Sequence, residues 1–327
     1  MDTWPSVSVV MPVRNGVATI GDALDGVLAQ DYPGDMEVVV ADGGSIDGTT
    51  EVVARFAGVH LVPNPAGGTP SGLNAAIAAS RGEVVVRCDA HAVLPPGYVR
   101  RAVEVLEATG ADNVGGVQDA QGVGPVQRAV AAAMSSRVGV GDANFHIGGR
   151  AGPADTVYLG VFRRATLERL GGFDERLERN QDYELNLRIR EGGGTVWFDP
   201  SLRVLYRPRA SFRELGSQYW QYGRWKRRMV TDHPGSLRWR QAAPPVFVVG
   251  VGGCVLAGAL GAPGWWLPPT AYALVVIATG IGASLRHRDP ALLLTPIALA
   301  TMHVSWGLGF LAGPPADGRP PQRLSEL

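Results

Sequence analysis

The chain has 327 residues and equal numbers of basic and acidic residues, 30 of each, so its formal net charge is zero. A nucleic-acid-binding protein normally has a basic excess, and we therefore expect no nucleic-acid partner. The two cysteines, Cys88 and Cys254, lie in segments of different character, which argues against a disulfide framework and favours a reducing compartment. No apolar signal region follows Met1, so a secretory leader is not expected.

The first part of the chain alternates predicted strands with predicted helices. Short β-branched apolar runs predict strands over residues 6–13, 36–41, 59–62 and 83–88. Apolar residues at helical spacing predict helices over residues 20–28, 52–56 and 71–82. This order predicts an α/β fold in which a mostly parallel sheet is covered by helices on both faces.

Polar residues stand at the carboxyl ends of these predicted strands. They are Arg14 and Asn15 after the first strand, Asp42 after the second, and Asp89 and His91 after the fourth. Parallel α/β sheets bind their ligands beyond this edge, where the ends of neighbouring strands meet. The order of the elements therefore predicts one binding site made by these residues.

The segment DGGSIDGT, residues 42–49, follows the second strand. Its glycines permit a tight turn and the close approach of a ligand, and an acid at a strand end can accept hydrogen bonds from a nucleobase or a ribose. A helix-capping turn made by Ser45 and Asp47 is an equally open interpretation. A dinucleotide fold is disfavoured because no G-x-G-x-x-G motif follows the first strand.

The triplet Asp89-Ala90-His91 follows a buried strand, so its two polar side chains can reach one cation. Carboxylate oxygens suit Mg²⁺, which binds together with substrate phosphates, and an imidazole nitrogen is compatible with Mn²⁺. A substrate whose diphosphate leaves with negative charge needs such a cation. The alternative is a polar loop with an incidental histidine.

Two acidic motifs follow, GGFDE over residues 171–175 and NQDYE over residues 180–184. The second motif opens a predicted helix that continues to Ile189. A helix dipole favours an ionised carboxylate in the first turn, and an ionised Asp182 can take a proton from an acceptor hydroxyl. The alternative is a carboxylate that only caps the helix.

Charge nearly disappears after Ala242. Uncharged runs cover residues 244–260, 265–285 and 291–315, and each approaches or reaches the roughly 20 residues with which a helix crosses a bilayer. We therefore expect three hydrophobic membrane helices, and the alternative is a buried helical core. Arginines at 238, 240, 286 and 288 flank these runs, and the positive-inside rule places both clusters and the N-terminal domain in the cytosol.

Four parts of the chain are predicted. They are a cytosolic catalytic domain over residues 1–210, an amphipathic membrane-interface segment over 211–242, three hydrophobic membrane helices over 243–313 and a Pro-rich tail over 314–327. The expected location is the inner, cytoplasmic membrane, with several crossings. Three crossings would place Arg319 and Arg323 outside, against the same rule, and a third segment that re-enters the membrane would remove this tension.

In their order along the chain, these motifs resemble family 2 glycosyltransferases of the inverting, type A fold. The matching segments are residues 8–15, 42–49, 89–91, 171–175 and 181–182, and the resemblance extends over roughly residues 6–230. Within that family, the chain is most similar to bacterial exopolysaccharide glucosyltransferases of the succinoglycan type, which also have C-terminal membrane segments. The resemblance implies a nucleotide-sugar-binding fold followed by transmembrane helices.

The resemblance also implies which residues bind the donor, and these are Pro12, Arg14, Asp42, Asn74 and Asp89. Pro12 and Arg14 would line the nucleotide pocket, and Asp42 would contact the uracil. Many relatives have Arg or Lys beside the position of Asn74, where this chain has Leu73, so we expect this chain to lack that part of the base contact.

By the same resemblance, Asp89 and His91 occupy the positions of a D-x-D motif, which holds the ribose, the diphosphate and a divalent cation, Mg²⁺ or Mn²⁺. His91 replaces the second acid of that motif, which leaves the identity of the metal open. Asp182 stands in the place of the catalytic base.

Gln221, Arg224 and Trp225 fit the Q-x-x-R-W pattern of processive polysaccharide synthases, in which it holds the acceptor near the membrane. The alternative, slightly favoured, is an interfacial helix whose Trp220, Trp225, Arg227 and Arg228 meet lipid headgroups. Processive synthases also have membrane segments before the catalytic domain. None is found here, so we expect the addition of one sugar at a time.

The leading hypothesis is inverting transfer of a hexose from a UDP-sugar to a lipid-linked glycan, in exopolysaccharide or cell-envelope glycan synthesis. The expected partners are a nucleotide-sugar donor, a lipid-linked glycan acceptor and membrane lipids. A polyprenyl-phosphate sugar synthase is one alternative, in which the lipid phosphate is the acceptor and no hydroxyl loses a proton. A catalytically inactive membrane scaffold is another, and the presence of Asp42, Asp89 and Asp182 together argues against it.

Overall fold

The computed structural model describes residues 4–314, which form two compact units. The first unit comprises residues 4–119 and 148–205, and the second comprises residues 120–147 and 206–314. Residues 120–147, which the sequence placed inside the catalytic domain, thus group with the helices that follow residue 205. Residues 315–327 of the predicted tail lie outside the described residues.

An eight-stranded sheet forms the centre of the first unit, in the order β3-β2-β1-β4-β7-β5-β8-β6. Strands β1, β2, β3 and β4 are parallel, whereas β7 pairs antiparallel with β4 and β5, and β6 pairs antiparallel with β8. The strands are β1 Val7–Val13, β2 Met36–Asp42, β3 Val59–Pro63, β4 Val84–Arg87, β5 Asn113–Ala120, β6 Gly152–Pro153, β7 Tyr158–Arg163 and β8 Val196–Tyr206. The predicted α/β fold is therefore confirmed, with all four predicted strands in the parallel part.

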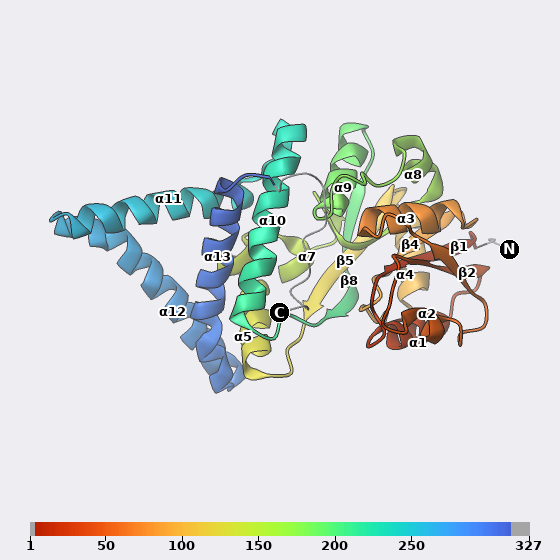
Figure 1. The fold of residues 1–327 in the computed structure, drawn as a ribbon, viewed down its shortest axis with the longest axis horizontal. Coiled ribbons are helices and arrows are strands. Elements are labelled where there is room, and N and C mark those ends of the chain that lie inside the picture. Colours follow the sequence, from red (N-terminus) through yellow and green to blue (C-terminus); the bar gives the residue numbers. More distant parts are fainter. Residues whose placement is uncertain (1–3, 315–327) are drawn as a thin grey trace. The chain divides into compact units, whose positions relative to one another are not determined.

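Helices cover both faces of this sheet because successive strand residues point to opposite sides. In β1, Val9 and Met11 join one apolar core, and Val10 joins the other. Figure 1 shows α3 on one side of β1 and β2, and α1 and α2 on the other. The helices of this unit are α1 Ile20–Leu28, α2 Thr49–Val53, α3 Thr69–Ala78, α4 Tyr98–Thr109, α8 Arg164–Leu170 and α9 Gln181–Glu191.

The parallel register brings the strand ends to one edge of the sheet. Val13 at the end of β1 lies opposite Asp42 at the end of β2, and Val10 lies opposite Arg87 at the end of β4. The loops that follow these strands therefore begin side by side, as the order of the elements predicted.

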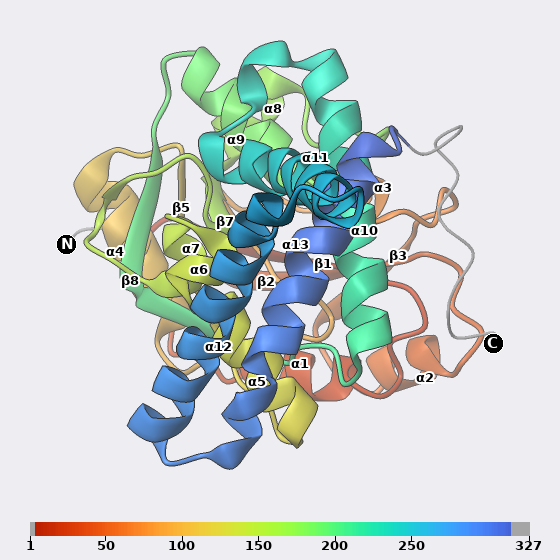
Figure 2. The ribbon, with the colours of Figure 1, turned by 90° about the vertical axis from the view of Figure 1, so that its left-hand side faces the viewer.

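The second unit is helical. Its elements are α5 Pro125–Met134, α6 Arg137–Val140, α7 Asn144–Ile147, α10 Phe212–Asp232, η1 Pro234–Ser236, α11 Trp239–Ala259, η2 Pro263–Trp266, α12 Leu267–His287, η3 Pro290–Leu294 and α13 Thr295–Leu311. Figure 2 shows α10 and α12 on either side of α13. Glycines permit a close crossing of α10 and α13, because a Cβ atom on Gly223 would lie 2.2 Å from the Trp306 carbonyl oxygen.

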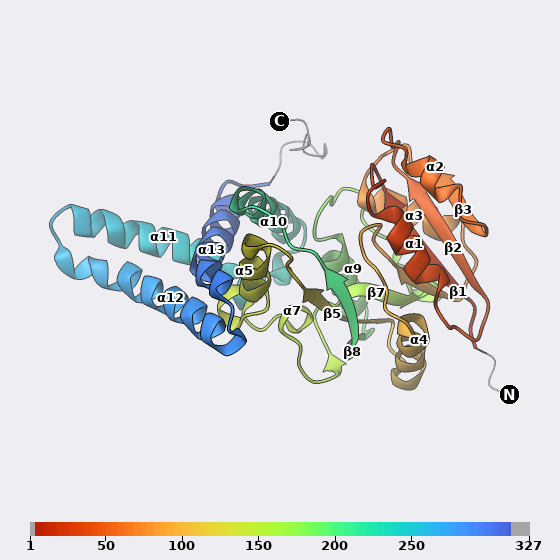
Figure 3. The same cartoon turned by 90° about the horizontal axis from the view of Figure 1, so that it is seen from below.

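Three apolar helices of this unit are long enough to cross a membrane, and they cover Trp239–Ala259, Pro263–His287 and Pro290–Leu311 of the described residues. α11 and α12 are joined through η2, and they diverge from that end (Figure 1 and Figure 3). Large apolar side chains on these helices are exposed, among them Val246, Leu256, Leu274 and Leu285. A buried helical core is therefore the wrong interpretation, and the prediction of three apolar helices of spanning length is confirmed.

Candidate donor-binding and catalytic site

Two loops at the carboxyl edge of the sheet are joined by hydrogen bonds. The Gly43 amide donates to the Val13 carbonyl at 2.8 Å, and the Asn15 amide donates to Ser45 Oγ at 2.7 Å. The side chain of Asn15 accepts in return from the Ile46 amide at 2.9 Å, with Asn15 itself in the left-handed conformation at φ 49°. The DGGSIDGT segment is thus held against the loop that follows β1.

Asp42 has one satisfied and one unsatisfied carboxylate oxygen. Its Oδ2 accepts from the amides of Gly44 and Ser45, both at 3.0 Å. Its Oδ1 is buried and has no hydrogen-bond partner among the described residues. Because a buried acceptor without a partner costs free energy, this oxygen is suited to accept a hydrogen bond from an N–H or O–H group of a ligand.

The turn-forming interpretation of the same segment applies to Asp47. Its Oδ1 accepts from the Thr49 amide at 3.1 Å, at the start of α2, and its Oδ2 accepts from the Val17 amide at 3.1 Å. Each interpretation of the motif therefore applies to a different residue. Asp47 fixes the loop, whereas Asp42 has a carboxylate oxygen that can accept a hydrogen bond from a ligand.

Arg14 and Pro12 lie where the sequence predicted, beside the same loops. Arg14 is exposed, and a Cβ atom on Gly67 would lie 3.0 Å from its Nη1. Pro12 contacts α3, since a Cβ atom on Gly72 would lie 3.0 Å from the Pro12 Cβ. These glycines allow α3 and its preceding loop to approach the end of β1, and the donor-binding role of both residues stays a prediction.

Asn74 on α3 bonds to the GGFDE turn. Its Nδ2 donates to the Phe173 carbonyl and to Glu175 Oε1, both at 2.9 Å, and its Oδ1 accepts from the Phe173 amide at 2.9 Å. Both N–H groups of the Asn74 side chain are thereby used, which gives this residue a structural role in holding the turn. Its predicted contact with the donor stays a prediction.

The central feature of the site is a buried arginine between two carboxylates. Arg87 at the end of β4 donates from Nε and Nη2 to Asp89 Oδ1, at 3.0 and 2.9 Å, and from Nη1 to Asp182 Oδ1. The exposed fraction is 6% for the Arg87 side chain, 17% for Asp89 and 38% for Asp182. The strand-end acid and the helix-start acid, 93 positions apart in the sequence, thus belong to one cluster.

Electrostatics differ between the two carboxylates. Burial acts to raise the pKa of Asp89, but the charges of Arg87, His91 and Arg179 outweigh it and lower that pKa below its ordinary value. Burial raises the pKa of Asp182 above its ordinary value, with the Asp89 charge adding to the effect and the Arg87 charge opposing it. Asp89 is therefore suited to remain ionised, and Asp182 is suited to exchange a proton.

Asp89 and His91 are compatible with a divalent cation bound together with a substrate. Both Arg87 bonds go to Oδ1 of Asp89, and no described hydrogen bond uses Oδ2. His91 is exposed. Among the described residues no group of three or more His, Cys, Asp or Glu side chains can hold a metal ion, so most of the ligands would come from the substrate phosphates and water.

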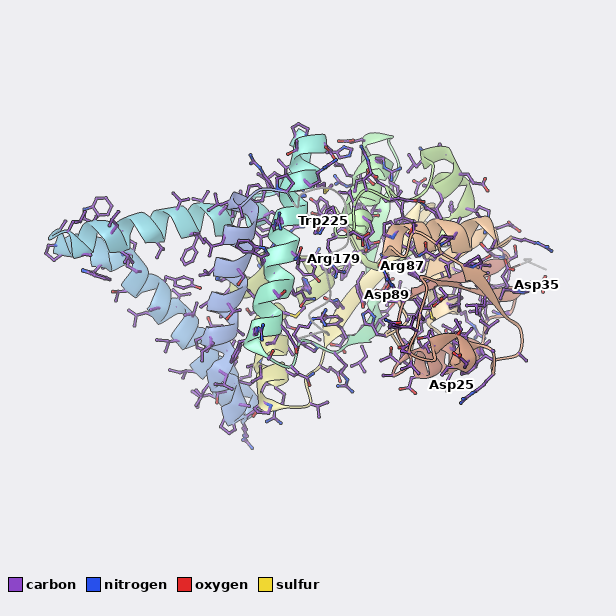
Figure 4. All side chains as sticks on the ribbon, viewed as in Figure 1. Asp25, Asp35, Arg87, Asp89, Arg179 and Trp225 are labelled. Atoms are coloured by element: carbon purple, nitrogen blue, oxygen red, sulfur yellow. The ribbon has the colours of Figure 1, made fainter. Side chains whose placement is uncertain are left out.

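Two positively charged residues of the site, Arg87 and Arg179, were not predicted from the sequence. Arg87 is the arginine that ends the apolar run VVVR, and a charge inside a buried strand is the signal that indicates it. Arg179 is exposed and lies close enough to Asp89 for its charge to lower the pKa of that carboxyl. Figure 4 shows Arg87, Asp89 and Arg179 in the same region of the molecule.

The predicted acceptor residues Gln221, Arg224 and Trp225 lie on α10, in the second unit. Arg224 donates to the carbonyls of Gly313 and Pro314, at 3.2 and 2.9 Å, beyond the end of α13. Trp225 is only 2% exposed (its position is labelled in Figure 4). The interpretation in which Trp225 meets lipid headgroups is therefore wrong, because its ring is enclosed by protein, and its acceptor role stays a prediction.

Comparisons with known proteins identify relatives over most of the chain. The family described as glycosyl transferase family 2 matches residues 8–171. Succinoglycan biosynthesis protein ExoA of Rhizobium meliloti (strain 1021) is 29% identical over 316 residues, which cover 94% of each chain. A Methanococcus voltae enzyme, dolichyl N-acetyl-alpha-D-glucosaminyl phosphate 3-beta-D-2,3-diacetamido-2,3-dideoxy-beta-D-glucuronosyltransferase, is 21% identical over 94% of this chain and 96% of its own.

Solved structures share the fold. The mannosyltransferase PcManGT from Pyrobaculum calidifontis, in complex with GDP-Man and Mn²⁺, superposes with a TM-score of 0.62 at 23% identity, over 93% of this chain and 89% of its own. S. aureus TarS 1-349 in complex with UDP gives a TM-score of 0.51 at 15% identity, over 94% and 90%. Both support the predicted type A fold. The matched family segment includes Asp42, Asp89 and His91 but ends before Asp182.

Proposed function

This chain belongs to glycosyl transferase family 2, and from that premise we propose that it transfers a sugar from a nucleotide-sugar donor to a hydroxyl of a lipid-linked glycan, with inversion at the anomeric carbon. The observation that carries the proposal is the Arg87 cluster, which brings the strand-end acid Asp89 together with the helix-start acid Asp182.

The donor binds at the carboxyl edge of the sheet. Asp42 offers its unpartnered Oδ1 to the nucleobase, for which we expect uracil, with Pro12 and Arg14 lining the pocket. Arg179 adds positive charge near Asp89, and a guanidinium suits the diphosphate of the donor. Asn74 supports this pocket from outside by fixing the GGFDE turn.

Asp89 and His91 are the residues that would hold a divalent cation, Mg²⁺ or Mn²⁺. When bound, such a cation neutralises the negative charge that develops on the departing diphosphate. The protein provides an ionised Asp89, since the Arg87 and Arg179 charges lower the pKa of that carboxyl.

Asp182 is the general base. Inversion requires the acceptor oxygen to attack from the side opposite the departing diphosphate, so the base and the diphosphate site must face each other across the anomeric carbon. Asp182 has 38% of its side chain exposed and can therefore reach an acceptor hydroxyl, take its proton and increase its nucleophilicity. The raised pKa of Asp182 makes it a stronger base than an ordinary aspartate.

Two observations support a lipid-linked acceptor at the cytoplasmic membrane. Three helices of the described chain are long and apolar enough to cross a membrane, with large apolar side chains exposed on them. The names of two full-length relatives refer to succinoglycan biosynthesis and to a dolichyl-linked sugar. We place the catalytic unit in the cytosol, where nucleotide sugars are the donors.

A direct transfer assay tests the proposal. The purified chain in nanodiscs is given a panel of UDP- and GDP-sugars with a membrane lipid extract, and donor-dependent glycolipid is measured. We expect one donor to be consumed with inversion, which the anomeric configuration of the product reports. Asp25→Asn, at an exposed acid of α1 (Figure 4), should retain full activity. Failure of every donor to give glycolipid would refute the proposal.

A further inference from the structure

A cavity of about 270 Å³ lies within the second unit, among α6, α11, α12 and α13. All its lining residues belong to that unit, and none is among the proposed donor-binding or catalytic residues. The side chains that matter for its chemistry are Arg137, Trp239, Arg240, Phe247, Tyr272 and His303.

One end of the cavity is aromatic. The rings of Phe247 and Tyr272 lie 4.3 Å apart between centroids, and the ring of His303 lies 5.9 Å from that of Tyr272. His303 Nε2 is 3.0 Å from the Val138 carbonyl, and Nδ1 is 3.0 Å from the Tyr272 hydroxyl. A carbonyl only accepts, so Nε2 donates, and Nδ1 of the neutral ring accepts from the hydroxyl. With their polar atoms satisfied, these rings present apolar faces.

The other end of the cavity is basic. Asp142 binds two neighbouring residues at the start of α11, since its Oδ1 accepts from Arg240 Nη1 and its Oδ2 accepts from Trp239 Nε1, each at 3.1 Å. The Arg240 side chain is only 11% exposed. Arg137 is exposed, and no described residue forms a hydrogen bond or ion pair with its side chain. The lining thus has two guanidinium groups, of which that of Arg240 is paired with Asp142 and that of Arg137 is exposed.

The two ends have the spacing of an amphiphile. Phe247 follows Arg240 by seven positions on α11, which is roughly 10 Å at the helical rise of about 1.5 Å per residue. Guanidinium groups form strong, geometrically defined hydrogen bonds with phosphate, while the aromatic end favours hydrocarbon. A ligand with a phosphate and an attached apolar chain satisfies both ends at once.

The volume of the cavity suits a lipid with one hydrocarbon chain rather than two. At about 270 Å³ the cavity is just below the roughly 300–1,000 Å³ of typical small-molecule sites, so it holds only the part of a lipid next to its phosphate. A diacyl phospholipid carries two chains on one headgroup, whereas a polyprenyl phosphate carries one. The remaining chain would continue along the exposed apolar side chains of α11, such as Val246 and Val249.

We propose that this cavity binds the phosphate and the first prenyl units of a polyprenyl-phosphate-linked acceptor. Arg137 and Arg240 hold the phosphate, and Phe247, Tyr272 and His303 enclose the chain. The inference rests on the proposed function, because it assigns a site to the lipid part of the proposed acceptor.

Binding without any donor tests the cavity directly. Farnesyl phosphate, a short single-chain probe, is titrated against the full chain in phosphatidylcholine nanodiscs, with radiolabelled probe as the readout. We expect farnesol and inorganic phosphate to bind at least tenfold more weakly, since each satisfies one end only. Phosphatidylglycerol should not displace the probe, and displacement by it at equal concentration would show a general lipid site and overturn the inference.

Matched variants complete the test. Ala243→Trp fills the cavity and should abolish probe binding, whereas Leu285→Trp, at an exposed position of α12 outside the cavity lining, should not. Arg137→Gln should weaken binding about tenfold or more, while Arg286→Gln, an exposed arginine away from the cavity, should leave it unchanged. If Ala243→Trp does not fold, the comparison of Arg137→Gln with Arg286→Gln decides. Wild-type affinity for the probe in Arg137→Gln overturns the inference.

The failure of this inference and that of the proposed function give different results. Asp182→Asn should bind the probe as the wild type does, because binding needs no base. Probe binding that depends on Arg137, without sugar transfer to any lipid, would refute the function alone. Sugar transfer with an unchanged KM for the lipid acceptor in Ala243→Trp would refute the cavity alone.

Discussion

Arg87 and Asp182 form an ion pair that joins the end of β4 to the first turn of α9. The same guanidinium also binds Asp89, at 2.9 Å, so one buried cation holds two carboxylates. Their mutual repulsion is thereby compensated in the donor-free protein. The pair fixes the position of the proposed base relative to the proposed diphosphate site.

Asp182→Asn should lower kcat by about 10²–10⁴, the range that general acid–base catalysis contributes. Donor affinity should hardly change, because the substitution preserves shape and leaves Asp42 and Asp89 in place. Steady-state kinetics and donor titration measure the two quantities separately. A loss of donor affinity with little loss of kcat would make Asp182 a binding residue, and wild-type turnover would favour a lipid phosphate as the acceptor, which carries no proton to remove.

The pH profile of kcat should report the raised pKa of Asp182. Burial first and the Asp89 charge second raise this pKa, and the base works only when deprotonated. Activity should therefore fall as the pH decreases, and it should do so at a higher pH than the ordinary aspartate value of about 3.9 would give. The residual activity of Asp182→Asn should lack this acidic limb, and an unchanged limb in that variant would assign it to another group.

Divalent cations should be required, and His91 should influence which one works best. Asp89→Ala should abolish transfer with the fold retained, and an excess of chelator should do the same to the wild type. His91→Asp replaces a nitrogen ligand with oxygen, so the ratio of activity with Mg²⁺ to activity with Mn²⁺ should rise. Full activity in excess chelator would contradict the metal requirement.

Arg87→Met should destabilise the donor-free protein, because Asp89 and Asp182 then repel each other without a cation between them. Breaking a fully buried pair costs about 3–5 kcal/mol, and we expect roughly 1–3 kcal/mol, since Asp182 is 38% exposed. Chemical unfolding measures the loss, and adding Asp182→Asn should recover part of it. Arg203→Met, which removes an exposed pair with Asp119, should cost about 1 kcal/mol or less.

Cysteine labelling should locate the two ends of α12 on opposite sides of the membrane. Gly264→Cys has open space around its Cβ, and His287→Cys is exposed at the other end of the helix. A membrane-impermeant maleimide should label Gly264→Cys on intact cells, and His287→Cys only after permeabilisation. The wild type is the control, since Cys88 and Cys254 are both buried. The reverse pattern would overturn the topology.

The amino-acid sequence by itself determined the features that depend on neighbouring residues. The β-branched runs of β1, β2 and β4 and the helical periodicity of α1 predicted the α/β alternation, and the long uncharged runs predicted three apolar helices. The order of the strands also placed Asp42 and Asp89 at one edge. These are local signals, because strand pattern, helix period and charge are properties of a short segment.

Only the tertiary structure decided which distant side chains meet. Arg87 connects Asp89 with Asp182. Asn74 forms hydrogen bonds with the GGFDE turn, and Trp225 is enclosed by protein rather than exposed to lipid. Each outcome depends on the packing of elements that are far apart in the chain, and the same residue types satisfy several arrangements locally. Burial then determines the chemistry, because the loss of solvation and the nearest charges together shift the pKa of each carboxylate.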